Sequence, residues 1–123
     1  MGKIFEVARP PDLQRRKYRR FPLRYPVLVE FSSGATACEV PTVSWNVSLG
    51  GLLLESPSDL PKSQLLRFTL TVEGGSVVRP LRFCGEGKVV RVEPRSFGAG
   101  FAVAVECTVP MFQIEDYLVG SSD

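Results

Sequence analysis

The sequence has no histidine, a single tryptophan and only three cysteines among its 123 residues. Without histidine the chain cannot build imidazole acid–base catalysis, Ser-His or Cys-His nucleophile pairs, or the usual zinc sites that include histidine. The cysteines Cys38, Cys84 and Cys107 are far apart and form no C-x-x-C pair. We expect three buried or half-buried thiols in strands, because free cysteine behaves as a small hydrophobic residue. The sequence predicts a binding protein and not an enzyme.

Long apolar segments are also missing. No apolar run reaches the length that a membrane-spanning helix needs. The first residues, MGKIFEVARPPD, lack the apolar core of a signal peptide, so we expect a cytoplasmic protein. A hydrophobic content of 44% and a charged content of 23% are typical of a globular chain, and the length suits one domain.

Positive charge is concentrated at the N-terminal end. Residues 1–26 carry eight Lys or Arg against two acidic residues, a net charge of +6. Because the whole chain has a net charge of +2, residues 27–123 sum to −4. This asymmetry indicates a basic segment attached to a neutral or acidic body, and it favours an anionic partner for the basic segment.

From residue 25 onward, short β-rich segments alternate with glycine and proline turns. The expected strand regions are residues 25–34, 36–48, 50–56, 65–73, 76–95 and 98–107. Pro41 suggests a bulge or an edge within the second segment, and Gly85 and Gly87 suggest a bend in the fifth. Six or seven short strands at this spacing favour a closed or nearly closed antiparallel barrel, which leaves no exposed sheet edge.

The C-terminal residues change to a helical pattern. Thr108 is a candidate N-cap, Pro110 suits the first turn, and Gly120 provides a stop signal. The apolar residues at helical spacing are Met111, Ile114 and Leu118. We therefore expect a flexible N-terminal arm over residues 1–13, kept out of a helix by two prolines, and a single domain over residues 14–120 that ends in a short helix.

Two short motifs could carry a binding site. The first is the arginine segment, residues 15–20 (RRKYRR), whose planar guanidinium groups suit phosphates and guanine edges. The R-x-x-x-R spacing recurs at Arg91 and Arg95. The second is NVSLGG, residues 46–51, which lies between two β-rich segments. Taken alone, the first could be a solvated basic arm and the second a simple turn.

Together, the two motifs resemble the PilZ domain family. Its members show an arginine-rich segment with R-x-x-x-R, a proline-marked first strand and then [D/N]-x-S-x-x-G. In this sequence RRKYRRFPLRYPV supplies Arg16 and Arg20, and NVSLGG supplies Asn46, Ser48 and Gly51. The later segments GEGKVVRVEP and FGAGFAVAVE are similar to the last strands of the family, so the likeness covers most of the chain.

The resemblance implies a six-stranded β-barrel that binds cyclic di-GMP between the arginine segment and the barrel. Arg16 and Arg20 would hold phosphate oxygens and the Hoogsteen edge of guanine. Asn46, where the family often has aspartate, would accept from guanine N1–H or its exocyclic amine without charge assistance. Ser48 would make a polar contact or fix the turn, and Gly51 would let the backbone approach closely.

Arg15 directly precedes the motif arginines, and in the family such an arginine accompanies the binding of two intercalated ligand molecules. The resemblance therefore implies a stacked ligand pair here, while Arg19 is expected to be a solvated side chain. Ligand binding would order the arginine segment over the barrel, and the new surface would signal to a separate partner protein.

Two other interpretations stay open. A small β-barrel with a basic arm could bind single-stranded nucleic acid, although the net acidic body disfavours tracking a polyanion. The chain could also be an adaptor that keeps this fold and contacts only proteins. The complete set of motif residues argues against this last interpretation.

Overall fold

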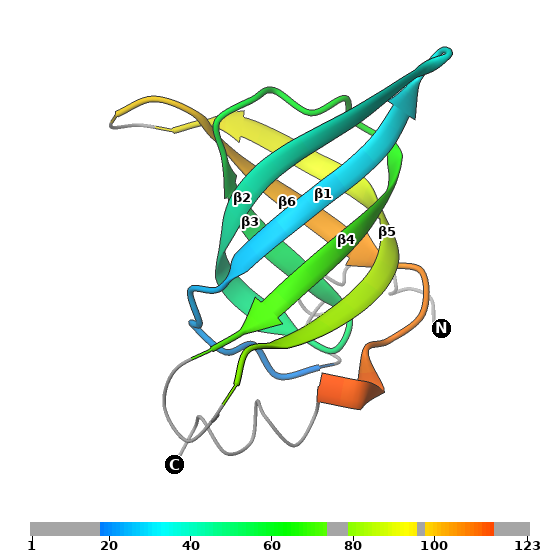
Figure 1. Ribbon diagram of the computed structural model, residues 1–123. Coiled ribbons are helices and arrows are strands. Elements are labelled where there is room, and N and C mark those ends of the chain that lie inside the picture. The colour runs from blue at the N-terminus through cyan, green and yellow to red at the C-terminus, as the bar shows by residue number, and fades with distance from the viewer. Residues whose placement is uncertain (1–17, 74–78, 96–97, 115–123) are drawn as a thin grey trace, which may run out of the picture.

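The computed structural model describes residues 18–73, 79–95 and 98–114 (Figure 1). Its strands are β1 (Pro26–Ser33), β2 (Thr36–Ser48), β3 (Gly51–Ser56), β4 (Leu65–Val72), β5 (Leu81–Pro94) and β6 (Phe101–Cys107). They form one closed barrel in the order β1-β2-β3-β6-β5-β4, and all neighbours are antiparallel. The predicted six-stranded antiparallel barrel is therefore confirmed. The predicted arm, residues 1–13, lies outside the described residues.

The strands form because their side chains alternate between the barrel interior and its outer surface. In β4, for example, Leu66, Phe68, Leu70 and Val72 are buried, whereas the residues between them are exposed or half-buried. The same inward positions on the other strands are filled mainly by valine and leucine. The fully buried members include Val27, Val29, Val47, Leu54, Val89 and Val103. Branched side chains of this kind fill the interior of a small barrel and leave no room for an internal ligand. Any binding site has to lie outside.

β2 contains a bulge, but not at the proline. Pro41 pairs in regular register with Leu28 of β1. The register instead shifts between Ser44 and Asn46, which leaves Trp45 as the extra residue. Pro41 needs no bulge because it lies in the part of β2 that pairs only with β1, where its missing N–H interrupts no second ladder.

Gly85 and Gly87 do not interrupt the strand, since both lie within the continuous strand β5. Their role is steric. A Cβ atom on Gly85 would lie 2.5 Å from Cζ of Phe68, the largest fully buried side chain. Glycine at this position therefore gives the Phe68 ring its space. Cys84, beside it, is exposed, so the expectation of a buried thiol is wrong there, while Cys38 and Cys107 are half-buried.

Only the start of the expected C-terminal helix lies within the described residues, and it is a single 3-10 turn, η1 (Phe112–Ile114), at one end of the barrel (Figure 1). Thr108 is not the N-cap of this turn, because the turn begins only at Phe112, and the Thr108 N–H donates to the carbonyl of Glu86 at 2.8 Å. Met111 and Ile114 are buried and close the core at this end. Among the described residues, no helix has the length and apolar character to cross a membrane.

The contact between Gly85 and Phe68 can be tested by mutation. We expect Gly85→Ala to lower the free energy of unfolding by about 1–3 kcal/mol, because the added methyl group overpacks the core. Phe68→Leu should remove this penalty, so a double-mutant cycle followed by urea denaturation should show a favourable coupling energy. Unchanged stability in Gly85→Ala would contradict the packing described here.

Candidate functional site

The end of the arginine segment is joined to the barrel by a pair of backbone hydrogen bonds. The Phe21 N–H donates to the Val47 carbonyl, and the Val47 N–H donates to the Phe21 carbonyl, each at 2.8 Å. The Phe21 side chain is buried in the core, which adds an apolar anchor to this bridge. Since Val47 lies between Asn46 and Ser48, the bridge brings Arg20 beside the second motif.

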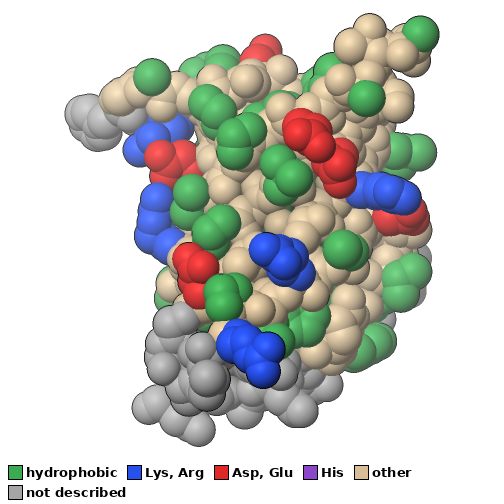
Figure 2. Space-filling model, viewed as in Figure 1, with side chains coloured by type: hydrophobic (Ala, Val, Ile, Leu, Met, Phe, Trp, Pro, Cys, Tyr) green, Lys and Arg blue, Asp and Glu red, His purple; other side chains and the backbone are tan. Residues whose placement is uncertain are grey.

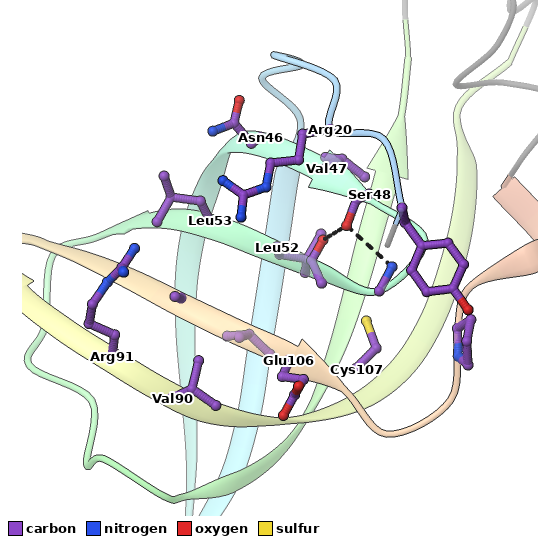
Figure 3. A pocket seen from close by; sticks show the side chains of 16 residues that line it. Arg20, Asn46, Val47, Ser48, Leu52, Leu53, Val90, Arg91, Glu106 and Cys107 are labelled. Carbon is purple, nitrogen blue, oxygen red and sulfur yellow. Dashed lines mark hydrogen bonds between the residues drawn. The ribbon is translucent and has the colours of Figure 1, made fainter. Parts of the chain in front are cut away.

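The bulge at Trp45 determines which way Asn46 points. In a regular strand Ser44 and Asn46 would face the same side, and Ser44 is fully buried. The extra residue shifts the alternation, so that Asn46 pairs with outward-facing Leu53 and Val47 enters the core. The shift leaves the Asn46 amide half-buried on the outer surface, next to Arg20 (Figure 3).

Ser48 and Gly51 shape the turn between β2 and β3. The Ser48 hydroxyl accepts a hydrogen bond from the Gly50 N–H at 3.2 Å and donates to the Gly51 carbonyl at 3.3 Å (Figure 3). A Cβ atom on Gly51 would lie 2.5 Å from the carbonyl oxygen of Val105 in β6. Gly51 therefore allows a close backbone approach, as expected, but the approach is to the neighbouring strand. Both residues hold the floor of the site in shape.

These motif residues line one pocket of about 530 Å³ on the outer face of β3, β6 and β5 (Figure 3). Arg20, Asn46, Ser48 and Gly51 all contribute to it, and its floor is mainly apolar, with Leu53 and side chains of β5 and β6. This volume lies within the range of small-molecule sites, roughly 300–1,000 Å³. Four of the six predicted site residues thus lie together, while Arg15 and Arg16 are outside the described residues.

The pocket also contains residues that the motifs do not identify. Tyr18 lies over the turn, and a Cβ atom on Gly50 would be 2.8 Å from its ring. The Tyr18 ring also meets Phe112 edge to face, with 6.4 Å between the centroids. Arg91 of β5 and Glu106 of β6 add charged side chains. In the sequence, only Gly50, the first glycine of the pair that ends NVSLGG, indicates that a side chain such as Tyr18 packs on this turn.

Arg19 does not line the pocket. Its guanidinium lies over the Phe21 ring, 5.0 Å from the centroid, and the residue is exposed. A cation over an aromatic face gains a small electrostatic stabilisation at such an exposed site. Arg19 therefore contacts its own segment, in addition to solvent.

Two other arginines, Arg24 and Arg95, form ion pairs with the carboxylate of Glu55 on β3. The N–O distances are 3.0 and 2.7 Å, and the Trp45 indole N–H donates to the same carboxylate at 2.9 Å. The hydrogen bond from Arg24 lowers the pKa of Glu55, and desolvation of the carboxylate acts in the opposite direction. The hydrogen bond from Trp45 and the charge of Arg95 lower this pKa further. Arg95 also lies 5.4 Å from the centre of the Trp45 ring. This cluster fixes the indole of the bulge.

The thiol of Cys107 lines the pocket and stays protonated at neutral pH. Burial, with a smaller contribution from the charge of Glu106, raises the pKa of Cys107 to about 12. In the described part of the chain, no group of three or more His, Cys, Asp or Glu could hold a metal ion. The polar, charged and aromatic side chains that line the pocket can form hydrogen bonds, ion pairs and stacking contacts.

The thiols should differ in reactivity. We expect maleimide to label Cys84 rapidly at mildly alkaline pH and Cys107 only slowly, because the thiolate is the reactive form and Cys107 stays protonated well below pH 12. Mass spectrometry of the two single-cysteine variants would measure both rates. Equal rates at the two positions would contradict the burial of Cys107.

Comparison with known proteins places this barrel in a family. The family model of the PilZ domain matches residues 14–118. The chain therefore belongs to the PilZ domain family, as the two motifs predicted. A search of the curated proteins found no match.

Two solved structures share the fold. The Bacillus subtilis inhibitor of motility, MotI/DgrA, is 18% identical with a TM-score of 0.68, and the match covers 88% of this chain and 49% of that one. This chain thus spans about half the length of MotI/DgrA. The PilZ domain of Escherichia coli YcgR, solved with c-di-GMP, is 15% identical with a TM-score of 0.61, covering 85% of this chain and 86% of that one.

Proposed function

We propose that this protein is a receptor for cyclic di-GMP that has no enzymatic activity. The observation that carries the proposal is the convergence of Arg20, Asn46, Ser48 and Gly51 on one outer pocket. Four motif residues from two separate segments meet there because of the Phe21–Val47 bridge. The YcgR domain, similar in fold, was solved with this ligand, which supports the assignment.

Each pocket residue suits one part of the ligand. The Arg20 guanidinium offers a planar fork to a phosphate or to O6 and N7 of guanine. The Asn46 amide oxygen accepts from the guanine N1–H or amine. A base can lie on the apolar floor beside Leu53, while Ser48 and Gly51 keep the turn in place.

Arg15 and Arg16 complete the proposed site from the arginine segment. Arg16 would act with Arg20 on the phosphates, and Arg15 would favour a second, intercalated ligand molecule. Because like charges in this segment repel until an anion neutralises them, ligand binding would order the segment over the barrel. The surface formed in this way would signal to a separate protein in the cytoplasm.

A dinucleotide fits this molecule better than a long polyanion does. Acidic and basic side chains are interspersed over the barrel face around β1 and β4 (Figure 2). The net charge of residues 27–123 is negative. A nucleic acid that extended beyond the arginine segment would therefore be repelled by the rest of the protein. The pocket also matches the size of a small ligand rather than that of an extended strand.

Calorimetric titration of cyclic di-GMP tests the proposal. We expect saturable binding that weakens roughly tenfold to a hundredfold in Arg20→Ala and in Arg16→Ala, because each loses a charged hydrogen-bond donor. Arg19→Ala is the matched control, since it removes the same charge next to Arg20 but from outside the pocket.

The same titration separates the alternatives. An equal loss in Arg19→Ala and Arg20→Ala would indicate general attraction of anions, and preference for a short RNA over cyclic di-GMP would indicate a nucleic-acid-binding protein. A folded protein that binds neither would leave the adaptor interpretation. The stoichiometry shows whether a ligand pair binds, and Arg15→Ala should reduce two molecules to one.

Ordering of the arginine segment should appear in amide exchange. We expect exchange over residues 12–20 to slow when cyclic di-GMP is added. The Phe21 N–H is an internal reference, because it already donates to the Val47 carbonyl without ligand. Exchange measured by NMR would resolve these positions, and equally fast exchange with and without bound ligand would contradict the ordering mechanism.

A further inference from the structure

β5 contains a second bulge, on the opposite side of the pocket from the first. The register between β5 and β6 runs from Val89 paired with Val105 directly to Arg91 paired with Ala104, so Val90 is the extra residue. Val89 is fully buried. In a regular strand Arg91 would point inward with it, where an unpaired guanidinium cannot be accommodated. The bulge turns Arg91 to the outer surface, where it is exposed.

The two bulges act in the same way. The bulge at Trp45 in β2 turns Asn46 outward, and the bulge at Val90 in β5 turns Arg91 outward. The two strands flank β3 and β6, whose outer face forms the floor of the pocket. Each bulge therefore adds one polar side chain to the pocket, from opposite sides of the same floor.

Arg91 faces the pocket, and Glu106, the one acidic side chain among the described lining residues, forms no ion pair with it. Figure 3 shows its guanidinium directed towards the part of the floor where Leu53 lies, with Arg20 on the other side of Leu53. Among the described residues, Arg91 makes no ion pair within 4.0 Å, whereas Arg24 and Arg95 both pair with Glu55. Its fork of donors is thus available to an incoming ligand.

We propose that Arg91 is a ligand-binding residue that holds the half of cyclic di-GMP farther from the arginine segment. This inference rests on the proposed function and extends it. Cyclic di-GMP has two phosphates and two guanines, so one molecule presents similar groups to both sides of the floor. Arg20 takes the side next to the arginine segment, and Arg91, placed by a strand of the barrel, takes the other side through a phosphate or a guanine edge.

The test compares Arg91→Ala with Arg82→Ala by calorimetric titration of cyclic di-GMP. Arg82 is the matched control because it is exposed on the same strand but does not line the pocket. We expect Arg91→Ala to raise the Kd roughly tenfold to a hundredfold, and Arg82→Ala to leave it nearly unchanged. Arg91→Lys should recover only part of the loss, since an ammonium keeps the charge but lacks the bidentate fork.

The outcomes separate this inference from the function on which it rests. If the unmodified protein binds and Arg91→Ala binds equally well, Arg91 is not a ligand-binding residue and the receptor function stands. Equal losses in Arg91→Ala and Arg82→Ala would also overturn the inference, because they would indicate only the loss of positive charge. If the unmodified protein does not bind cyclic di-GMP, the proposed receptor function is wrong, and the inference about Arg91 is overturned with it. Unchanged thermal unfolding of Arg91→Ala would confirm that the loss is not one of folding.

Discussion

The backbone bridge between Phe21 and Val47 is the constraint on which the site depends. It consists of only two hydrogen bonds, yet it fixes the end of the arginine segment against the strand that carries the second motif. The buried Phe21 ring keeps water from competing for these bonds. Without the bridge Arg20 and Asn46 would belong to separate surfaces, and the pocket would lose one wall. The site is therefore an extension of the barrel and not an independent loop.

A closed barrel with a filled interior offers its outer surface for binding, and strand alternation limits which residues reach it. The bulges relax this limit at two places. Each allows a polar residue to face the pocket without forcing a polar residue into the core on the other side of the strand. The glycines provide a second kind of adjustment, since Gly51 brings β3 close to β6 and Gly85 gives space to Phe68. Local irregularity thus builds the site while the core stays regular.

The barrel could be predicted from the sequence because alternation and turn residues are local signals. The motif residues were also recognisable, because their order along the chain is itself a pattern. The bulges were not, since Pro41 gave a stronger local signal than Trp45, and the register depends on the partner strand. Arg91 and Tyr18 were missed for the same reason, as their place in the pocket follows from pairing and packing between distant segments. The helical start was predicted too early at Thr108, because the described helical turn begins at Phe112 and the backbone at Thr108 is still hydrogen-bonded to Glu86 of β5.

The distribution of charge offers a physical basis for the proposed selection of an anion by a protein of low net charge. Glu55 pairs with Arg24 and Arg95, so these two guanidinium groups stabilise the surface and contribute little attraction to a ligand. Arg20 and Arg91 lie outside this cluster and face the apolar floor. In the proposed receptor, selectivity would depend on the position of these two charges rather than on the number of charges. In that proposal, a compact ligand with two anionic groups would contact both arginines and cover the floor between them, whereas a single phosphate would contact only one side.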